Sequence, residues 1–257
     1  MEFFAITSAA FLASLLTFFS GFGLGTLLTP VFAIFFPIDL AVAMTAIVHF
    51  LNGLFKLGLV GRHAVMRIVL RFGIPAFLAA FLGAWVLVRV SDLPPLFVYS
   101  AFGRTLNVLP VKLVISGLMI IFACFELVPR LRDLKFSQRY LSLGGILSGF
   151  FGGLSGHQGA LRSAFLARSG LTKEQFIGSG VAIAAMIDIV RLTVYSTHIV
   201  AERIVENVSL VTAATIAAFL GALLGNRFLK KVSMDAIQAI VSVTLFVLAI
   251  AIAAGVI

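Results

Sequence analysis

Charged residues are scarce in this chain of 257 residues: only 11% of the positions are Asp, Glu, Lys or Arg, whereas 61% are hydrophobic. So few polar side chains cannot cover a water-soluble globule, and the mean hydropathy of +1.16 agrees. Most of the surface must face lipid or other helices. We therefore predict a multi-pass protein of a cell membrane, of the kind found in the bacterial inner membrane.

Several chemical signatures are also missing. The single cysteine, Cys124, excludes an internal disulfide. No glycine-rich loop ends in Lys followed by Ser or Thr, which argues against ATP hydrolysis. Basic residues are spread singly over short loops, so no nucleic-acid surface is indicated despite a net charge of +9. The chain has four histidines, His49, His63, His157 and His198. They lack metal-ligand spacing and have no acidic cluster with them, so we predict no metal and no cofactor.

Long apolar runs are what the sequence has instead. About 20 apolar residues suffice to cross the hydrocarbon core of a bilayer as a helix. The alternation that a strand barrel would need is absent, so we predict an all-α polytopic fold. We expect about eight helical segments, at residues 3–19 with 26–36, 39–60, 68–89, 110–128, 140–151 with 160–169, 174–197, 207–226 and 234–256.

The chain has the pattern of an internal duplication. The hexamer Ala-Ala-Phe-Leu-Gly-Ala occurs at residues 79–84 and again at 217–222. A glycine-broken apolar segment opens each half, and we name these interruptions the first break (residues 20–26) and the second break (residues 152–159). Interrupted helices in duplicated halves are typical of secondary transporters. We predict two homologous four-segment repeats, at residues 1–128 and 140–257, joined by a basic loop at 129–139.

The distribution of basic residues bears on topology. If each broken segment crosses the membrane once, the cations of the loops divide equally between the two faces. If each is a re-entrant hairpin, one face keeps only Arg89, Arg104, Lys112 and Arg203, and the other collects Arg62, Arg67, Arg71, Arg130, Arg132, Lys135, Arg139, Arg168, Lys173, Arg227, Lys230 and Lys231. The second arrangement obeys the positive-inside rule. It predicts an inverted repeat with both termini outside the cytoplasm.

The two breaks are candidate anion sites. Glycine allows a helix to stop, and the next half-helix begins with unpaired N–H groups and a partial positive charge. Tight packing of helices through small residues is the alternative role for these glycines. The candidate residues are Gly23, Gly25 and Thr26 in the first break and Ser155, Gly156, His157 and Gln158 in the second.

Ionisable side chains inside apolar segments are costly and therefore functional candidates. Arg162 follows the second break, and either adds charge to a site or extends to the interface. Lys56 has the same two interpretations. A stripe on one helix face carries Thr45, His49, Asn52 and Lys56, and the corresponding segment of the other half offers Ser179, Asp188 and Arg191. Asp188 and Arg191 are three residues apart, so their pairing is equally consistent with a structural role.

These motifs resemble the TauE/SafE sulfite-exporter family of membrane permeases. The features that carry the resemblance are Gly21-Phe22-Gly23-Leu24-Gly25-Thr26 with Pro30 and Ala41 to Thr45, and Ser148-Gly149-Phe150-Phe151-Gly152-Gly153-Leu154-Ser155-Gly156 with Gly178-Ser179-Gly180. The resemblance implies an eight-segment duplicated fold and ion-driven transport of small anions, often sulfur-containing. The family commonly has a denser glycine run in each break. The residues His157, Gln158 and Arg162 suggest a specialised site here.

The leading hypothesis is a secondary transporter of a small anion, such as sulfite or an organosulfonate, that works by alternating access in the lipid bilayer. A coupling proton or sodium ion is the expected partner, and His49 and His157 are either proton carriers or buried, hydrogen-bonded histidines. A membrane-embedded enzyme or sensor that uses His157 and Arg162 is the alternative, and a channel is a third. Cation transport is disfavoured, because Asp188 is the only acid in the middle of a segment. The pattern does not indicate an oligomeric state.

Overall fold

A computed structural model describes residues 1–20, 23–101, 103–132, 134, 136–198, 201–228 and 234–256. A helix occupies each segment predicted to be apolar and helical. In chain order these helices are α1 (Glu2–Ser20), α2 (Leu24–Ala33), α3 (Ile38–Val60), α4 (Met66–Ser91), α5 (Pro110–Leu127), α7 (Leu141–Ser155), α8 (Gly159–Leu166), α9 (Lys173–His198), α11 (Val208–Phe228) and α12 (Met234–Ala253). Gly21 and Phe22 of the first break, and the cations Lys135, Lys230 and Lys231, lie outside the described residues.

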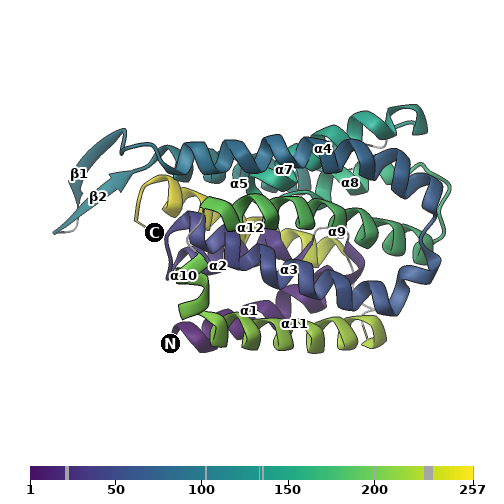
Figure 1. Ribbon diagram of the computed structural model, residues 1–257, viewed down its shortest axis with the longest axis horizontal. Coiled ribbons are helices and arrows are strands. Elements are labelled where there is room, and N and C mark those ends of the chain that lie inside the picture. Colours follow the sequence, from purple (N-terminus) through teal and green to yellow (C-terminus); the bar gives the residue numbers. More distant parts are fainter. Residues whose placement is uncertain are drawn as a thin grey trace.

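Four helices of the described part are long and apolar enough to cross a membrane, and they correspond to α3, α4, α9 and α11. The long helices lie side by side along the longest axis of the molecule (Figure 1). The polypeptide is a helical membrane protein. This agrees with the prediction from hydropathy, because a lipid-facing helix satisfies all of its backbone hydrogen bonds internally.

The remaining elements are short and lie between these helices. They are η1 (Gly61–His63), β1 (Phe97–Ala101), β2 (Arg104–Val108), α6 (Pro129–Arg132), η2 (Gln138–Tyr140) and α10 (Ala201–Glu206). The connection predicted as a basic loop at 129–139 thus contains α6 and η2.

Strands β1 and β2 form an antiparallel hairpin that the all-helical prediction did not include, and the prediction was wrong for these residues. Phe97 is paired with Val108 and Ala101 with Arg104, and Gly103 in the turn has a φ angle of 72°. Aromatic and β-branched residues favour strands. The hairpin projects from the end of the molecule at which both chain termini lie (Figure 1). Tyr99 anchors it there by donating a hydrogen bond to the carbonyl oxygen of Ala254, at 2.5 Å.

Both glycine-broken segments fold as helical hairpins. The backbone N–H of Phe136, ahead of α7, donates to the carbonyl oxygen of Ala164 near the end of α8, at 3.3 Å. The two ends of the hairpin of α7 and α8 therefore lie together. They lie near η1, because α9 follows α8 and its start packs against η1. The α1 and α2 hairpin has its ends at the other end, where the residues after α2 share a groove with Lys112 and Val256.

Glycines allow α7 to pack directly on α4. Gly145, Gly149 and Gly153 recur every fourth residue, and a Cβ atom on any of them would collide with a backbone carbonyl group of α4. Residues four apart share one helix face, so the three form a continuous seam of close backbone contact.

The repeated hexamer places a glycine at a close helix crossing in each of its two copies. A Cβ atom on Gly83 of α4 would collide with the carbonyl oxygen of Phe150 in α7. A Cβ atom on Gly221 of α11 would collide with the carbonyl oxygen of Phe11 in α1. In each hexamer the glycine thus lets a long helix cross the first arm of the opposite hairpin.

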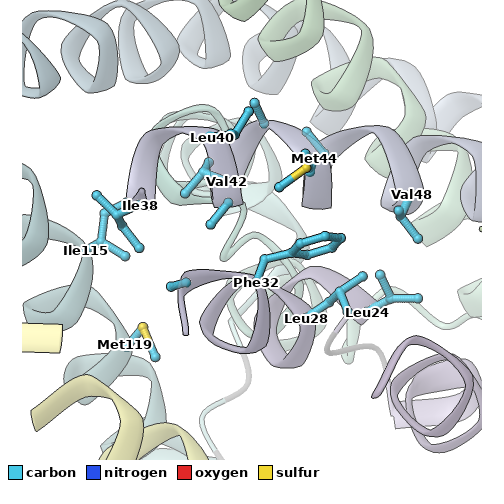
Figure 2. Close-up of a cluster of buried hydrophobic side chains, with 14 of the residues drawn as sticks. Leu24, Leu28, Phe32, Ile38, Leu40, Val42, Met44, Val48, Ile115 and Met119 are labelled. Atoms are coloured by element: carbon cyan, nitrogen blue, oxygen red, sulfur yellow. The ribbon is translucent and has the colours of Figure 1, made fainter. Parts of the chain in front are cut away.

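A buried hydrophobic cluster holds the return arm of the first hairpin in place. Figure 2 shows Leu24, Leu28 and Phe32 of α2 lying along α3, with Ile115 and Met119 of α5 to one side. Met44 of α3 and Met119 of α5 belong to the same cluster and are fully buried. Burial of side chains of this size stabilises the fold by about 1.5–3 kcal/mol each. The packing fixes the first break beside the middle of α3.

Candidate functional site between the two helix breaks

Asp188 is the centre of a buried hydrogen-bond network in the middle of α9. Its Oδ2 atom lies 2.5 Å from Nδ1 of His49 on α3. Its Oδ1 atom accepts from Nε of Arg191 at 2.9 Å and from Nε2 of Gln158 at 3.2 Å. Gln158 in turn accepts a hydrogen bond at Oε1 from Nη1 of Arg162, at 3.0 Å. The network thus joins α3, the second break, α8 and α9, and it connects residues up to 139 positions apart.

A cavity of about 50 Å³ adjoins this network, and we call it the central cavity. It has space for a few water molecules or one small anion. Its lining extends along α3 from His49 to Lys56 and along α9 from Ala184 back to Phe176, so it is directed toward η1. The polar lining side chains are Thr17, His49, Asn52, Lys56, Arg162 and Ser163.

Lys56 and Arg162 bring two cations to this cavity. Each side chain is almost fully buried, with 7% of Lys56 and 6% of Arg162 exposed. Nζ of Lys56 lies 5.3 Å from the centroid of the Phe18 ring, a cation–π contact that partly replaces water. The structure therefore places Lys56 inside the protein and not in an interfacial position.

Positive charge is in excess in the buried part of the described chain. The buried cations are Lys56, Arg162 and Arg191, and Asp188 is the only buried carboxylate among the described side chains. With neutral histidines, three positive charges and one negative charge leave a net charge of +2. Burial of an uncompensated ion costs several kcal/mol. A bound anion would offset this cost.

At the second break, the guanidinium of Arg191 from α9 lies against the backbone. Gly156 ends α7 with a left-handed φ angle of 80°, and its N–H bonds to the carbonyl oxygen of Gly152. Arg191 is fully buried, and its Nη1 and Nη2 atoms have no hydrogen-bond partner among the described residues. Tyr195, one turn further along α9, donates to the carbonyl oxygen of Gly153.

The first break lies directly against the second. Gly23 has a φ angle of 89° immediately before α2, and Nε2 of His49 would be 3.2 Å from a Cβ atom at this position. A Cβ atom on Gly25 would lie 3.7 Å from the carbonyl oxygen of Gly156 and 3.6 Å from the methyl carbon of Thr45. The hydroxyl of Thr45 has no hydrogen-bond partner among the described residues.

His157 belongs to a different, smaller cavity of about 10 Å³, lined also by Thr26, Phe122, Ala160 and Leu245. Its Nδ1 atom lies 3.0 Å from Oγ of Ser155, and its ring is stacked on Phe122 with centroids 5.6 Å apart. Because Arg162 lines the central cavity instead, the structure does not bring His157 and Arg162 to one pocket. The geometry gives no support to an enzyme or sensor that uses these two side chains together.

Two other predicted residues have structural partners. Ser179 accepts a hydrogen bond from the backbone N–H of Val65 at 2.9 Å, which tethers the start of α4 to α9 outside both cavities. Asn52 lines the central cavity but also exchanges hydrogen bonds with Ser14, at 3.1 and 3.3 Å.

The sequence analysis missed the contribution of α1 to the site. Ser14 holds Asn52, and Thr17 and Phe18 line the central cavity. The spacing of Ser14 and Thr17, two polar residues three positions apart in an apolar segment, was a usable signal. Within the described residues, no group of three His, Cys, Asp or Glu side chains is arranged to hold a metal ion.

The family model described as sulfite exporter TauE/SafE matches residues 6–252. The chain belongs to the TauE/SafE family. It is therefore a membrane transporter, in agreement with its long apolar helices. Searches of curated proteins and of solved structures found no match.

Proposed function

We propose that this TauE/SafE protein is a multi-pass secondary transporter of the bacterial inner membrane that carries a small, sulfur-containing anion such as sulfite or an organosulfonate. The observation that carries the proposal is the net charge of +2 buried around a cavity, with Asp188 as the only compensating acid among the described buried side chains. In a low-dielectric interior such a charge distribution attracts anions strongly.

The anion binds in the central cavity between Lys56 and Arg162. Both cations line the cavity, and Arg162 is oriented by its hydrogen bond to Gln158. Arg162 lies in the first turn of α8, so its charge adds to the partial positive charge of that helix end. Asn52 supplies an amide close to the same space.

The packing pattern supports two inverted repeats, residues 1–128 and 140–257, joined by 129–139. Corresponding helices of the two halves have corresponding neighbours in the opposite half. Helix α1 packs on α11 as α7 packs on α4, and α2 contacts α12 as α8 contacts α5. The two hairpins begin at opposite ends of the molecule. An axis in the membrane plane relates such halves.

The asymmetry of the cavities supports transport by alternating access. The central cavity is directed toward η1, the end that carries Arg62, Arg67 and Lys173. This is the cytoplasmic end under the positive-inside rule. The stacked rings of Phe122 and His157 and the buried Tyr195 lie outside the lining of the central cavity, and we infer that they close it toward the other end. Rocking of the repeats about the two breaks would expose the anion to the opposite side.

Ligand-induced stabilisation of the purified protein tests this proposal. A ligand that binds only the folded state at about 100 times its Kd raises stability by about 2.7 kcal/mol. We expect sulfite or a sulfonate such as methanesulfonate to raise the Tm, and sodium chloride at equal ionic strength to have little effect. Arg162→Gln should abolish the shift, whereas Arg168→Gln, a change at an exposed position in the loop after α8, should retain it. An equal shift in both variants, or no shift with any anion of the panel, would contradict the proposed site.

A further inference from the structure

The pair formed by His49 and Asp188 connects the central cavity to the network behind it. We propose that this pair is the proton-binding site that couples anion transport to a proton gradient, with Nε2 of His49 as the atom that takes up and releases the proton. The inference rests on the proposed transport function and names its coupling ion.

The geometry of the pair assigns a separate role to each ring nitrogen. Nδ1 lies 2.5 Å from Oδ2 of Asp188, so a proton lies between these two atoms. In the neutral imidazole Nε2 is then the unprotonated nitrogen. This atom lies beside Gly23, and both His49 and Gly23 line the central cavity. A proton arriving through the cavity therefore reaches Nε2 first.

Asp188 stabilises the protonated state of the buried His49. The carboxylate of Asp188 is fully buried and faces the imidazole directly, so it stabilises an imidazolium by charge and by the hydrogen bond at Nδ1. Its other oxygen remains bound to Arg191 and Gln158. The binding step is the addition of one proton to the Nε2 lone pair, and no other bond forms or breaks.

The charged groups that face His49 come from three helices. Asp188 and Arg191 face it from α9, Arg162 from α8, and Lys56 lies two turns further along α3. Helix α2 has no titratable residue. The other elements packed on α3 are η1, α4, α5, α10 and α11. Their charged residues lie in short connecting segments or within two turns of a helix end, at Arg62, His63, Arg67, Arg71, Arg89, Lys112, Glu126, Glu202, Arg203, Glu206 and Arg227.

The positive charge that the proton adds to the site couples proton binding to anion binding. Protonation of Nε2 raises the net buried charge from +2 to +3, which strengthens anion binding beside Lys56 and Arg162. Release of the proton lowers the charge and weakens the binding. Proton and anion are therefore bound together and released together, so they move in the same direction across the membrane.

Flux measurements with the purified full-length protein in liposomes test the coupling. Methanesulfonate and sulfate are suitable probes, because their charges stay constant between about pH 6 and pH 8, whereas sulfite itself titrates in this range. Exchange of labelled for unlabelled anion at equal pH measures transport alone. Uptake driven by an inward proton gradient, with a pH-sensitive dye inside the liposomes, measures coupling.

For the unaltered protein we expect a gradient of one pH unit to support about tenfold accumulation of methanesulfonate, because one unit corresponds to 1.36 kcal/mol per proton. Acidification of the interior should accompany uptake. His49→Gln and Asp188→Asn should reduce gradient-driven uptake at least tenfold more than they reduce exchange. His63→Gln is the matched control, since His63 in η1 lines neither cavity, and it should retain both activities.

The outcomes separate the two proposals. Exchange by the unaltered protein, with neither gradient-driven uptake nor acidification of the interior, would overturn the coupling and leave the transport function in place. Gradient-driven uptake that survives in His49→Gln in proportion to exchange would remove His49 from the coupling site. Absence of exchange with both anions would contradict the proposed function and the coupling with it.

Discussion

Arg191 of α9 points its Nη1 atom at the left-handed glycine that ends α7: a Cβ atom on Gly156 would lie 2.6 Å from this nitrogen. The absence of a side chain at Gly156 therefore lets the guanidinium reach the second break while its Nε atom still binds Asp188. A single methyl group at this position would disturb both the backbone and the buried ion pair.

Gly156→Ala should therefore destabilise the protein by more than backbone strain alone. An alanine in the left-handed region costs about 1–2 kcal/mol, and displacement of packed groups by the added methyl costs about 1–3 kcal/mol more. Gly170→Ala is the control, because Gly170 has a φ angle of 67° but open space around its Cβ position. Thermal unfolding in detergent measures both. Equal losses in the two variants would show that Arg191 accommodates the methyl group freely.

Lys56→Met should weaken anion binding without lowering the stability of the protein in the absence of anion. Without anion, removal of a buried cation that has no acid beside it among the described residues should leave the Tm unchanged or raise it, because apolar replacement of buried charge is often neutral or stabilising. Stabilisation by millimolar sulfite should fall, with Kd raised about tenfold or more, in line with charge pairs worth about 1.4 kcal/mol or more in a partly dry site. Lys112→Met, at the far end from the central cavity, should retain the response. Loss of Tm without anion in Lys56→Met would indicate a structural cation instead.

The two hexamer glycines should respond alike to substitution. Gly83→Ala and Gly221→Ala each force a methyl group into the backbone of the crossing helix, so we expect each to cost about 1–3 kcal/mol. Gly117→Ala in α5, where the Cβ position is open, should be neutral or stabilise by about 0.5–1 kcal/mol. Chemical or thermal unfolding of the three variants provides the measurement. A loss confined to one hexamer would argue against equivalent crossings in the two halves.

Accessibility of introduced cysteines tests the orientation. On a Cys124→Ala background, Ser100→Cys in β1 and Thr172→Cys before α9 are exposed positions at opposite ends of the molecule. A membrane-impermeant maleimide added to intact cells should label Ser100→Cys, and Thr172→Cys only after permeabilisation, because the basic end is expected in the cytoplasm. The reverse pattern would invert the topology, and labelling of the native Lys135 loop from outside would contradict it independently.

The helices were predictable because the membrane restricts the alternatives. Long apolar runs such as residues 68–89 can only be helices in lipid, and the observed α4 extends two residues beyond each end of that prediction. The hairpin at Phe97–Val108 was missed because it is short and lies between apolar segments, where hydropathy carries no information on secondary structure.

The candidate site was only partly predictable. His49, Arg162, Asp188 and Arg191 stood out since ionisable residues in apolar segments are rare and costly. The pairing of Asp188 with Arg191 followed from their spacing on one helix, and the structure confirms it. Nothing in the sequence showed that Asp188 also binds His49, or that His157 and Arg162 line separate cavities.

The sequence by itself determined the membrane class, the position of each long helix, the two breaks and the set of ionisable residues within apolar segments, because hydropathy and glycine act locally along the chain. The tertiary structure alone decided which of these residues meet. Close packing at Gly83, Gly149 and Gly221 sets how α4 crosses α7 and how α11 crosses α1, and the separate packing of α3 on α9 brings His49 to Asp188. Contacts between residues far apart in the chain depend on helix crossings, which local sequence patterns do not specify.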